Sequence, residues 1–155
     1  MAAPGETDLT TLLATLKVSL SPTTYLFLTF PPPTTIYTLP SALQLQMAFQ
    51  ESEGVTVITT EDSARENGYT LPNLPSTPSV TAAFPCRMIT LNVHSSLEAV
   101  GFIAVIATEL KKLGKGVDPV SGFFHDHCFV PVGREKEAIV CLESIAVRVR
   151  RREMF

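Results

Sequence analysis

One segment of the sequence, Val93-His94-Ser95-Ser96-Leu97-Glu98, places polar side chains where a predicted strand gives way to a predicted helix. Ser95 and Glu98 have the spacing of a capping box, in which the serine hydroxyl and the glutamate carboxylate each accept the other residue's backbone N–H. Free N–H groups at such a helix start attract anions. The segment is therefore either a binding site for a carboxylate, such as that of an amino acid, or an ordinary capped helix start.

The three histidines of the chain, His94, His125 and His127, are the next candidates for chemistry. His94 follows the predicted strand, and the other two flank Asp126 in the turn between two later strands. In a split β-α-β arrangement this turn lies at the same edge of the sheet as the end of the first strand, so we expect the histidines to lie close together. Three interpretations stay open: a polar hairpin turn, contact with a bound ligand, or a metal site, because histidine is a common zinc ligand.

The sequence lacks the common catalytic motifs. It contains no G-x-S-x-G elbow, no Walker A loop, no H-E-x-x-H pair and no C-x-x-C pair. A triad of Ser95, His94 and Asp126 is conceivable, but adjacent residues rarely point toward each other, and geometry defines a triad. We therefore predict no catalytic residue, no enzyme activity and no cofactor.

The second half of the chain predicts the elements that position these residues. They are a strand over residues 88–93, a helix over 95–113, strands over 117–124 and 128–132, and a helix over 133–145. Gly114 follows the first helix and is expected to end it. Val147 and Val149 alternate with arginines, which favours a final edge strand. This order is typical of a ferredoxin-like subdomain.

The first half predicts a looser copy of the same order. Thr7 or Asp8 can cap a helix that carries leucines on one face, namely Leu9, Leu12, Leu13 and Leu16. The later elements are a strand over residues 25–30 that ends at Pro31, a helix over 45–53 followed by Gly54, a strand over 55–59 and a helical turn over 61–67. Four prolines in the segment from Tyr69 to Pro85, with Pro85 as the last of them, predict a linker or a long surface loop.

Composition limits the possible function classes. Hydrophobic residues make up 45% of the 155 residues and charged residues 17%, which is enough apolar content for a packed core. The formal net charge of −3 gives no basic field for nucleic acid. The 3 cysteines are widely spaced and indicate no disulfide framework, and no apolar stretch approaches the ~20 residues that cross a bilayer. The first residues show no signal-peptide pattern, so we predict a cytoplasmic protein without a membrane or nucleic-acid partner.

Two blocks of the second half, residues 89–101 and 122–131, resemble the CASTOR-type ACT domain group. The opening Gly5-Glu6-Thr7-Asp8-Leu9 and the strand over 25–30 are similar to the N-terminal half of small two-ACT-domain proteins of bacteria and fungi. The resemblance implies an α+β fold of tandem ferredoxin-like (ACT) subdomains, with antiparallel sheets and helices on one face. The implied divisions are an N-terminal ACT-like subdomain over 5–70, the Pro-rich linker or loop over 71–85, an ACT domain over 86–147 and a basic tail over 148–155.

The resemblance also implies a function. ACT domains typically bind amino acids at interfaces between two units, through the loop after the first strand and the start of the first helix. Carried over by position, the ligand-binding residues are His94, Ser95, Ser96, Leu97 and Glu98, with His125 and His127 from the facing turn. We expect a regulatory or sensor module that binds a small molecule, an amino acid, and pairs as a homodimer. Two alternatives stay open: a protein–protein interaction module without a small ligand, and a metal-binding protein that uses the histidines.

Overall fold

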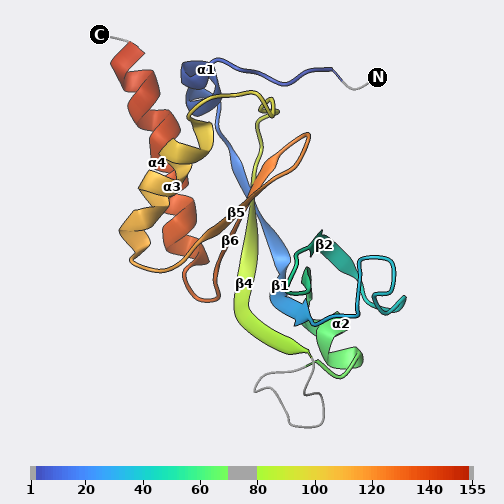
Figure 1. Cartoon of the computed structure of the whole chain (residues 1–155). Helices are drawn as coiled ribbons and strands as arrows, with labels where there is room; N and C mark the ends of the chain where they lie inside the picture. The colour runs from blue at the N-terminus through green and yellow to red at the C-terminus, as the bar shows by residue number, and fades with distance from the viewer. Residues whose placement is uncertain (1–2, 70–79, 154–155) are drawn as a thin grey trace. The chain divides into compact units, whose positions relative to one another are not determined.

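The computed structural model describes residues 3–69 and 80–153 of the chain. The described part is an α+β structure whose strands pair antiparallel (Figure 1), so the predicted fold class is confirmed. Its elements are, in chain order, α1 (Leu9–Ala14), β1 (Val18–Phe30), β2 (Leu45–Gln50), β3 (Val55–Thr60), α2 (Glu61–Glu66), β4 (Thr81–Leu91), α3 (Phe102–Leu110), a 3₁₀ turn (Lys111–Leu113), β5 (Asp118–Ser121), β6 (Asp126–Pro131) and α4 (Glu135–Glu153). Among the residues described, no helix is long and apolar enough to cross a membrane.

The chain forms two compact units. The first unit joins Met1–Pro22 to Arg87–Phe155, and the second unit is Thr23–Cys86. Strands β1 and β4 therefore each contribute residues to both units. This grouping differs from the boundaries expected from the sequence, because the N-terminal helix α1 packs with α3 and α4. The division into subdomains expected from the sequence stays a prediction.

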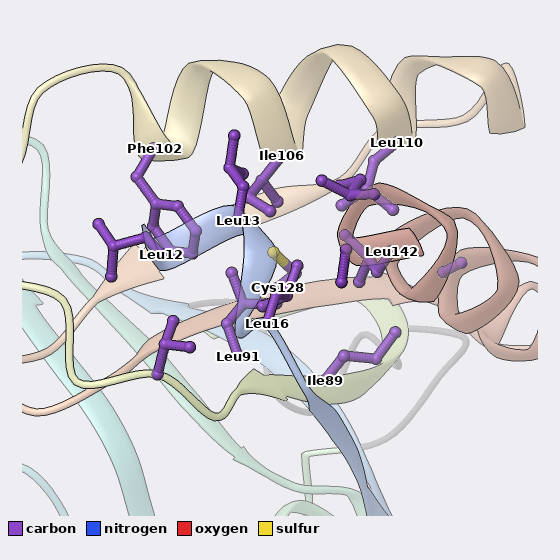
Figure 2. Close-up of a cluster of buried hydrophobic side chains, with 14 of the residues drawn as sticks. Leu12, Leu13, Leu16, Ile89, Leu91, Phe102, Ile106, Leu110, Cys128 and Leu142 are labelled. Atoms are coloured by element: carbon purple, nitrogen blue, oxygen red, sulfur yellow. The ribbon is translucent and has the colours of Figure 1, made fainter. Parts of the chain in front are cut away.

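The first unit has the strand order β1-β4-β6-β5, and helices α1, α3 and α4 pack together beside it. Its order along the chain, β4-α3-β5-β6-α4, is that of a split β-α-β motif, as the sequence predicted. The start of β1 lies beside β4, where the last strand of a ferredoxin-like fold belongs. A cluster of buried apolar side chains lies between helices and sheet (Figure 2) and includes Leu12, Leu13, Leu16, Ile89, Leu91, Phe102, Ile106, Leu110, Cys128, Val130, Ala138 and Leu142.

The C-terminal segment is a helix rather than the predicted edge strand. α4 continues without a break to Glu153, so the expected strand through Val147 and Val149 and the expected basic tail from residue 148 are both wrong. The buried positions Leu142, Ile145 and Ala146 keep helical spacing, and Val149 continues the same face. Burial of this face on α1 and α3 outweighs the strand-like alternation of valine with arginine.

The second unit has the strand order β2-β3-β1-β4 and carries the short helix α2. The predicted strand over 55–59 and the helical turn over 61–67 are confirmed as β3 and α2, and the Thr60 side chain caps α2 by accepting the N–H of Ser63. The predicted helix over 45–53 is wrong, because these residues form β2 and then a turn to β3 that Glu51 and Gly54 close. Leu, Gln, Met and Ala favour helices locally, but β3 is buried and needs a hydrogen-bonding neighbour on this side.

Strand β4 begins within the stretch that its prolines marked as a linker or loop. Residues 71–79 of that predicted segment lie outside the described residues, whereas Thr81 to Pro85 form the start of β4. The strand predicted over 88–93 is the second half of β4, which ends at Leu91. Ile89 and Leu91 are both fully buried on the helix side of the first unit. This end of β4 leads into the segment that the sequence singled out.

Candidate functional site

The segment predicted to start a helix at Ser95 is a loop. α3 begins only at Phe102, and the N–H of Glu98 donates to the hydroxyl of Ser96 over 3.1 Å, so the capping box of Ser95 and Glu98 does not form. The N-cap of α3 is Gly101, whose φ of 87° lies in the left-handed region that glycine adopts without steric cost. The predicted helix start is therefore wrong, and Gly101 has a backbone role rather than a place inside the helix.

The N-terminal segment before α1 holds this loop in place. The N–H of Glu6 donates to the carbonyl of His94 over 2.8 Å, and the N–H of Ser96 donates to the carbonyl of Glu6 over 2.9 Å. A Cβ atom on Gly5 would lie 2.5 Å from the backbone nitrogen of Ser96, so this close approach requires glycine. The N–H of Ser95 donates to the carbonyl of Val93. Two of the amides expected to bind an anion are thus already used within the protein.

A small pocket lies beside the same loop, at the start of α3. Its volume is about 160 Å³, below the range of about 300–1,000 Å³ typical of drug-sized ligands. It combines backbone and small side chains of the loop and the first turn of α3 with polar groups from the β5–β6 hairpin. The lining residues are Ser95, Ser96, Leu97, Ala99, Gly101, Phe102, Ile103, Ala104, Ser121 and Asp126.

Asp126 places a buried carboxylate in this pocket. Its Oδ2 accepts a hydrogen bond from the Ser95 hydroxyl over 2.6 Å, and both residues are only 5% exposed. Side chains alternate along a strand, so Asp126 shares its face of β6 with Cys128 and Val130, which pack in the core under the helices. A carboxylate has about four acceptor sites. Asp126 can therefore hold a cationic group in the pocket while it keeps its bond to Ser95.

The opposite wall of the pocket is the start of α3. Gly101 has no side chain to accept a hydrogen bond, and no other side chain in the described parts of the chain caps this helix. The first N–H groups of a helix lack partners within it, and the helix dipole adds a partial positive charge there. Phe102, Ile103 and Ala104 carry these groups and line the pocket. The pocket therefore offers an acceptor for a cation on one side and donors for an anion on the other.

The structure brings together some of the predicted ligand-binding residues and separates the others. Ser95, Ser96 and Leu97 line the pocket. Glu98 is exposed and lies outside the lining, as do the three histidines, His94, His125 and His127. The carbonyl of His125 accepts the N–H of Gly122 and so closes the β5–β6 turn. Of the predicted ligand-binding residues, only those of the loop before α3 therefore belong to the pocket.

His94 points toward the aromatic tip of the β5–β6 turn. Its ring centroid lies 5.5 Å from that of Phe124 and 6.4 Å from that of Phe123. Both phenylalanines are about half exposed, and the Nε2 atom of His94 is buried without a hydrogen-bond partner among the described residues. The expected meeting of His94 with this turn is observed, but the contact is aromatic.

His127 lies on the other face of β6 from Asp126. Its Nδ1 atom is 3.0 Å from the hydroxyl oxygen of Thr90 on β4. Partial burial lowers the pKa of His127 below its usual value, and the neighbouring His125 acts in the same direction. The neutral ring is therefore favoured near pH 7. Within the described ranges 3–69 and 80–153, no group of three or more His, Cys, Asp or Glu residues is arranged to hold a metal ion.

Three parts of the pocket were not among the ligand-binding residues predicted from the sequence, namely Asp126, Ser121 and the first turn of α3. From the sequence, Asp126 is the middle of a turn and a member of the conceivable triad, whereas in the structure it is the first residue of β6. Strand alternation from the apolar Cys128 and Val130 was the available signal, because it places Asp126 on the core face. No sequence signal marked the late start of α3, since Ser95 and Glu98 matched a capping pattern well.

Comparison with known proteins supports the fold. The family model described as the ACT domain matches residues 4–73. No curated protein gives a match to this chain. Among solved structures, a Vibrio cholerae protein of unknown function, described as a possible transport protein, is 28% identical with a TM-score of 0.72, and the match covers 89% of this chain and 95% of that chain.

Two further structures have the same architecture at lower identity. A protein from Agrobacterium tumefaciens is 14% identical with a TM-score of 0.63, and the match covers 84% of this chain and 89% of that one. The regulatory subunit of aspartate kinase from Thermus flavus is 9% identical with a TM-score of 0.62, with coverage of 83% and 95%. These likenesses show a fold of the ACT, ferredoxin-like type. The family match falls on the half of the chain that looked like the looser copy.

Proposed function

We propose that this chain is a regulatory or sensor module that binds a small amino acid in the pocket between the Ser95–Leu97 loop and the start of α3. The observation that carries the proposal is the pairing of the buried Asp126 carboxylate with the uncapped first turn of α3 in one small cavity. An amino acid is a zwitterion, so its ammonium group matches Asp126 and its carboxylate matches the helix N–H groups. The volume of about 160 Å³ favours a small side chain.

The groups that bind the carboxylate in this pocket differ from the loop amides expected from the sequence. The loop amides of Ser95 and Ser96 donate to Val93 and Glu6, so the amides of Ile103 and Ala104 take that role. The hydroxyls of Ser95 and Ser121 stand beside Asp126 as further partners for the ammonium group. His94, Glu98, His125 and His127 then act only from outside the pocket, if a bound partner reaches them.

A regulatory role is supported by the match to the ACT domain model and by the fold shared with an aspartate kinase regulatory subunit. We extend this to the CASTOR-type group on the sequence blocks at residues 89–101 and 122–131. We also propose that the chain pairs as a homodimer in the cytoplasm. Size-exclusion chromatography with light scattering tests the pairing, and a monomer at every concentration would contradict it.

A screen of the common amino acids by thermal unfolding and calorimetry tests the binding proposal. A ligand at 100 times its dissociation constant stabilises by about 2.7 kcal/mol. For a chain of this size that raises Tm by about 5–10 °C. N-acetyl and methyl-ester derivatives of the active amino acid should bind weakly, because each lacks one of the two charges. Asp126→Asn should abolish the shift, whereas Lys136→Gln on the exposed surface of α4 should preserve it.

A second candidate function is docking to another protein through exposed apolar side chains of the loop before α3 and of the β5–β6 turn. Leu97 and Val100 are 63% and 83% exposed, and Phe123 and Phe124 at the hairpin tip are 52% and 53% exposed. Exposed apolar groups of this size are commonly covered by partners. If no amino acid shifts Tm and the protein self-associates in a way that Phe123→Ser weakens, docking is favoured over ligand binding.

A further inference from the structure

A second cavity lies at the other end of α3, and it has a different chemistry. Its volume is about 260 Å³, and it opens between the C-terminal half of α3 and the segment that leads into β5. The floor consists of Ile106, Leu110 and Cys128, each no more than 1% exposed. Figure 2 shows Ile106 and Leu110 extending from α3 toward the strand that carries Cys128. The cavity is thus a gap over the apolar core of the first unit.

The sides of this cavity are also apolar. Val117 and Pro119 close it on the β5 side, and Ala107 on α3 presents only a methyl group at its mouth. Water in such a cavity gains few hydrogen bonds, and burial of apolar surface contributes roughly 25 cal/mol per Å². A small branched hydrocarbon group that fills this space is stabilised there, because its apolar surface is removed from water.

Two lysines give the mouth of this cavity a positive charge. Lys111 and Lys115 line it, and neither forms an ion pair with any residue in the described parts of the chain. The adjacent Lys112 differs, because its ammonium group pairs with Glu109 over 2.8 Å. No acidic side chain belongs to the lining. The mouth therefore favours an anion and disfavours an ammonium group.

The end of α3 itself opposes an anion only weakly. A helix C-terminus carries about half a negative charge, whereas the two lysines carry two full positive charges. One carbonyl of this region, that of Leu113, already accepts a hydrogen bond from Arg134 over 2.8 Å. The net field at the mouth is therefore positive.

We propose that this cavity is a second binding site, specific for a short branched-chain monocarboxylate without an amino group. The aliphatic tail lies over Ile106, Leu110 and Cys128, and the carboxylate lies between Lys111 and Lys115. The site is separate from the amino-acid pocket, with which it shares no lining residue. It selects against amino acids, because its lining has no acidic side chain to pair with an ammonium group and its two lysines repel one.

Isovalerate and its neutral amide, isovaleramide, test this proposal on the full-length chain. Saturable binding of isovalerate by calorimetry or ligand-observed NMR is expected, with a dissociation constant on the order of 1 mM. The Lys111→Gln/Lys115→Gln double variant should weaken it about fivefold, the factor that corresponds to roughly 1 kcal/mol for two exposed charge interactions. The matched control, Lys136→Gln on α4, should leave the affinity unchanged.

A second variant tests the cavity independently of charge. Ala107→Leu adds three carbons at the exposed mouth, so it blocks the cavity without disturbing the buried core, and it should reduce affinity at least about tenfold. Equal binding of isovalerate and isovaleramide would overturn the carboxylate assignment. Absence of saturable binding up to about 10 mM, or full binding by Ala107→Leu, would overturn the site itself. None of these results depends on whether an amino acid binds beside Asp126.

Discussion

The hydrogen bond between Ser95 and Asp126 should be worth a measurable fraction of the stability of the protein. The Ser95→Ala variant removes the hydroxyl that donates to Oδ2 of Asp126 over 2.6 Å. Because both residues are 5% exposed, water replaces the lost donor poorly. Hydrogen bonds to charged groups contribute about 1.5–3 kcal/mol, so we expect the free energy of unfolding to fall by about 2 kcal/mol. At 2–4 °C per kcal/mol for a chain of this length, Tm falls by about 4–8 °C.

Urea unfolding followed by circular dichroism measures this loss directly. Ser121→Ala is the matched control, because Ser121 lines the same pocket but is exposed, and its removal should change stability by less than about 0.5 kcal/mol. Asp126→Asn keeps an acceptor oxygen and removes the charge, so it should cost about 1 kcal/mol. In the double variant the two losses should not add, since one interaction is removed twice.

The refuting result is a loss below about 0.5 kcal/mol for Ser95→Ala together with additive behaviour in the double variant. That outcome would mean that water reaches the carboxylate and that the serine contributes no net stabilisation. Asp126 would then belong to a hydrated pocket. The proposed ammonium site would lose its preorganised acceptor.

Three further predictions concern α3 and its surroundings. Gly101→Ala should destabilise the protein by about 1 kcal/mol, because alanine is strained at the positive φ of this position; the added Cβ itself meets only Leu9, at an ordinary 3.5 Å. Gly101→Asn should cost less in the same unfolding assay, since asparagine tolerates a positive φ better, and equal losses for the two variants would contradict a backbone cause. Burial acts to raise the pKa of Glu109, but hydrogen bonds and charges from Lys112 and Arg148 outweigh it and leave that pKa lowered, so the stabilisation exists at neutral pH and is lost as the pH falls through the lowered value. Glu109→Gln should therefore cost about 1 kcal/mol at pH 7, an amount discounted because both cations are partly exposed, and the difference from the unchanged protein should shrink as the pH falls through the lowered pKa of Glu109; a constant difference would refute the linkage. Burial raises the pKa of the Cys128 thiol to about 12, the Asp126 charge adds to this shift, and Cys86 is also buried. A disulfide reagent at pH 8 should therefore modify Cys141 first, and Cys86 and Cys128 only in denaturant. Early modification of Cys128 would mean that the cavity beside it opens.

The sequence predicted the architecture of the second half of the chain well, because the spacing of apolar residues along it matches the positions that are buried. Ile89 and Leu91 marked β4, Cys128 and Val130 marked β6, and Ala138 and Leu142 marked α4. The errors occurred where tertiary contacts override local preference. β2 is a strand because β3 needs a partner, and α4 runs on through Val147 because its inner face remains buried. Neither fact is encoded in the segment itself.

The candidate site was predictable only in part, and the reason lies in the loop between β4 and α3. Ser95 and Glu98 satisfy the local pattern of a helix start, but the backbone at Ser96 bonds to Glu6, a residue ninety positions earlier in the chain. That long-range pairing uses the amide of Ser96, one of those expected to bind an anion, and α3 begins only after Gly101. The free N–H groups therefore belong to Phe102, Ile103 and Ala104, whose apolar side chains gave no hint of a polar role. The carboxylate opposite them follows from strand alternation only if the strand predicted over 128–132 is extended back to Asp126, where β6 begins, since a shift of one residue would send that side chain to the other face of the sheet.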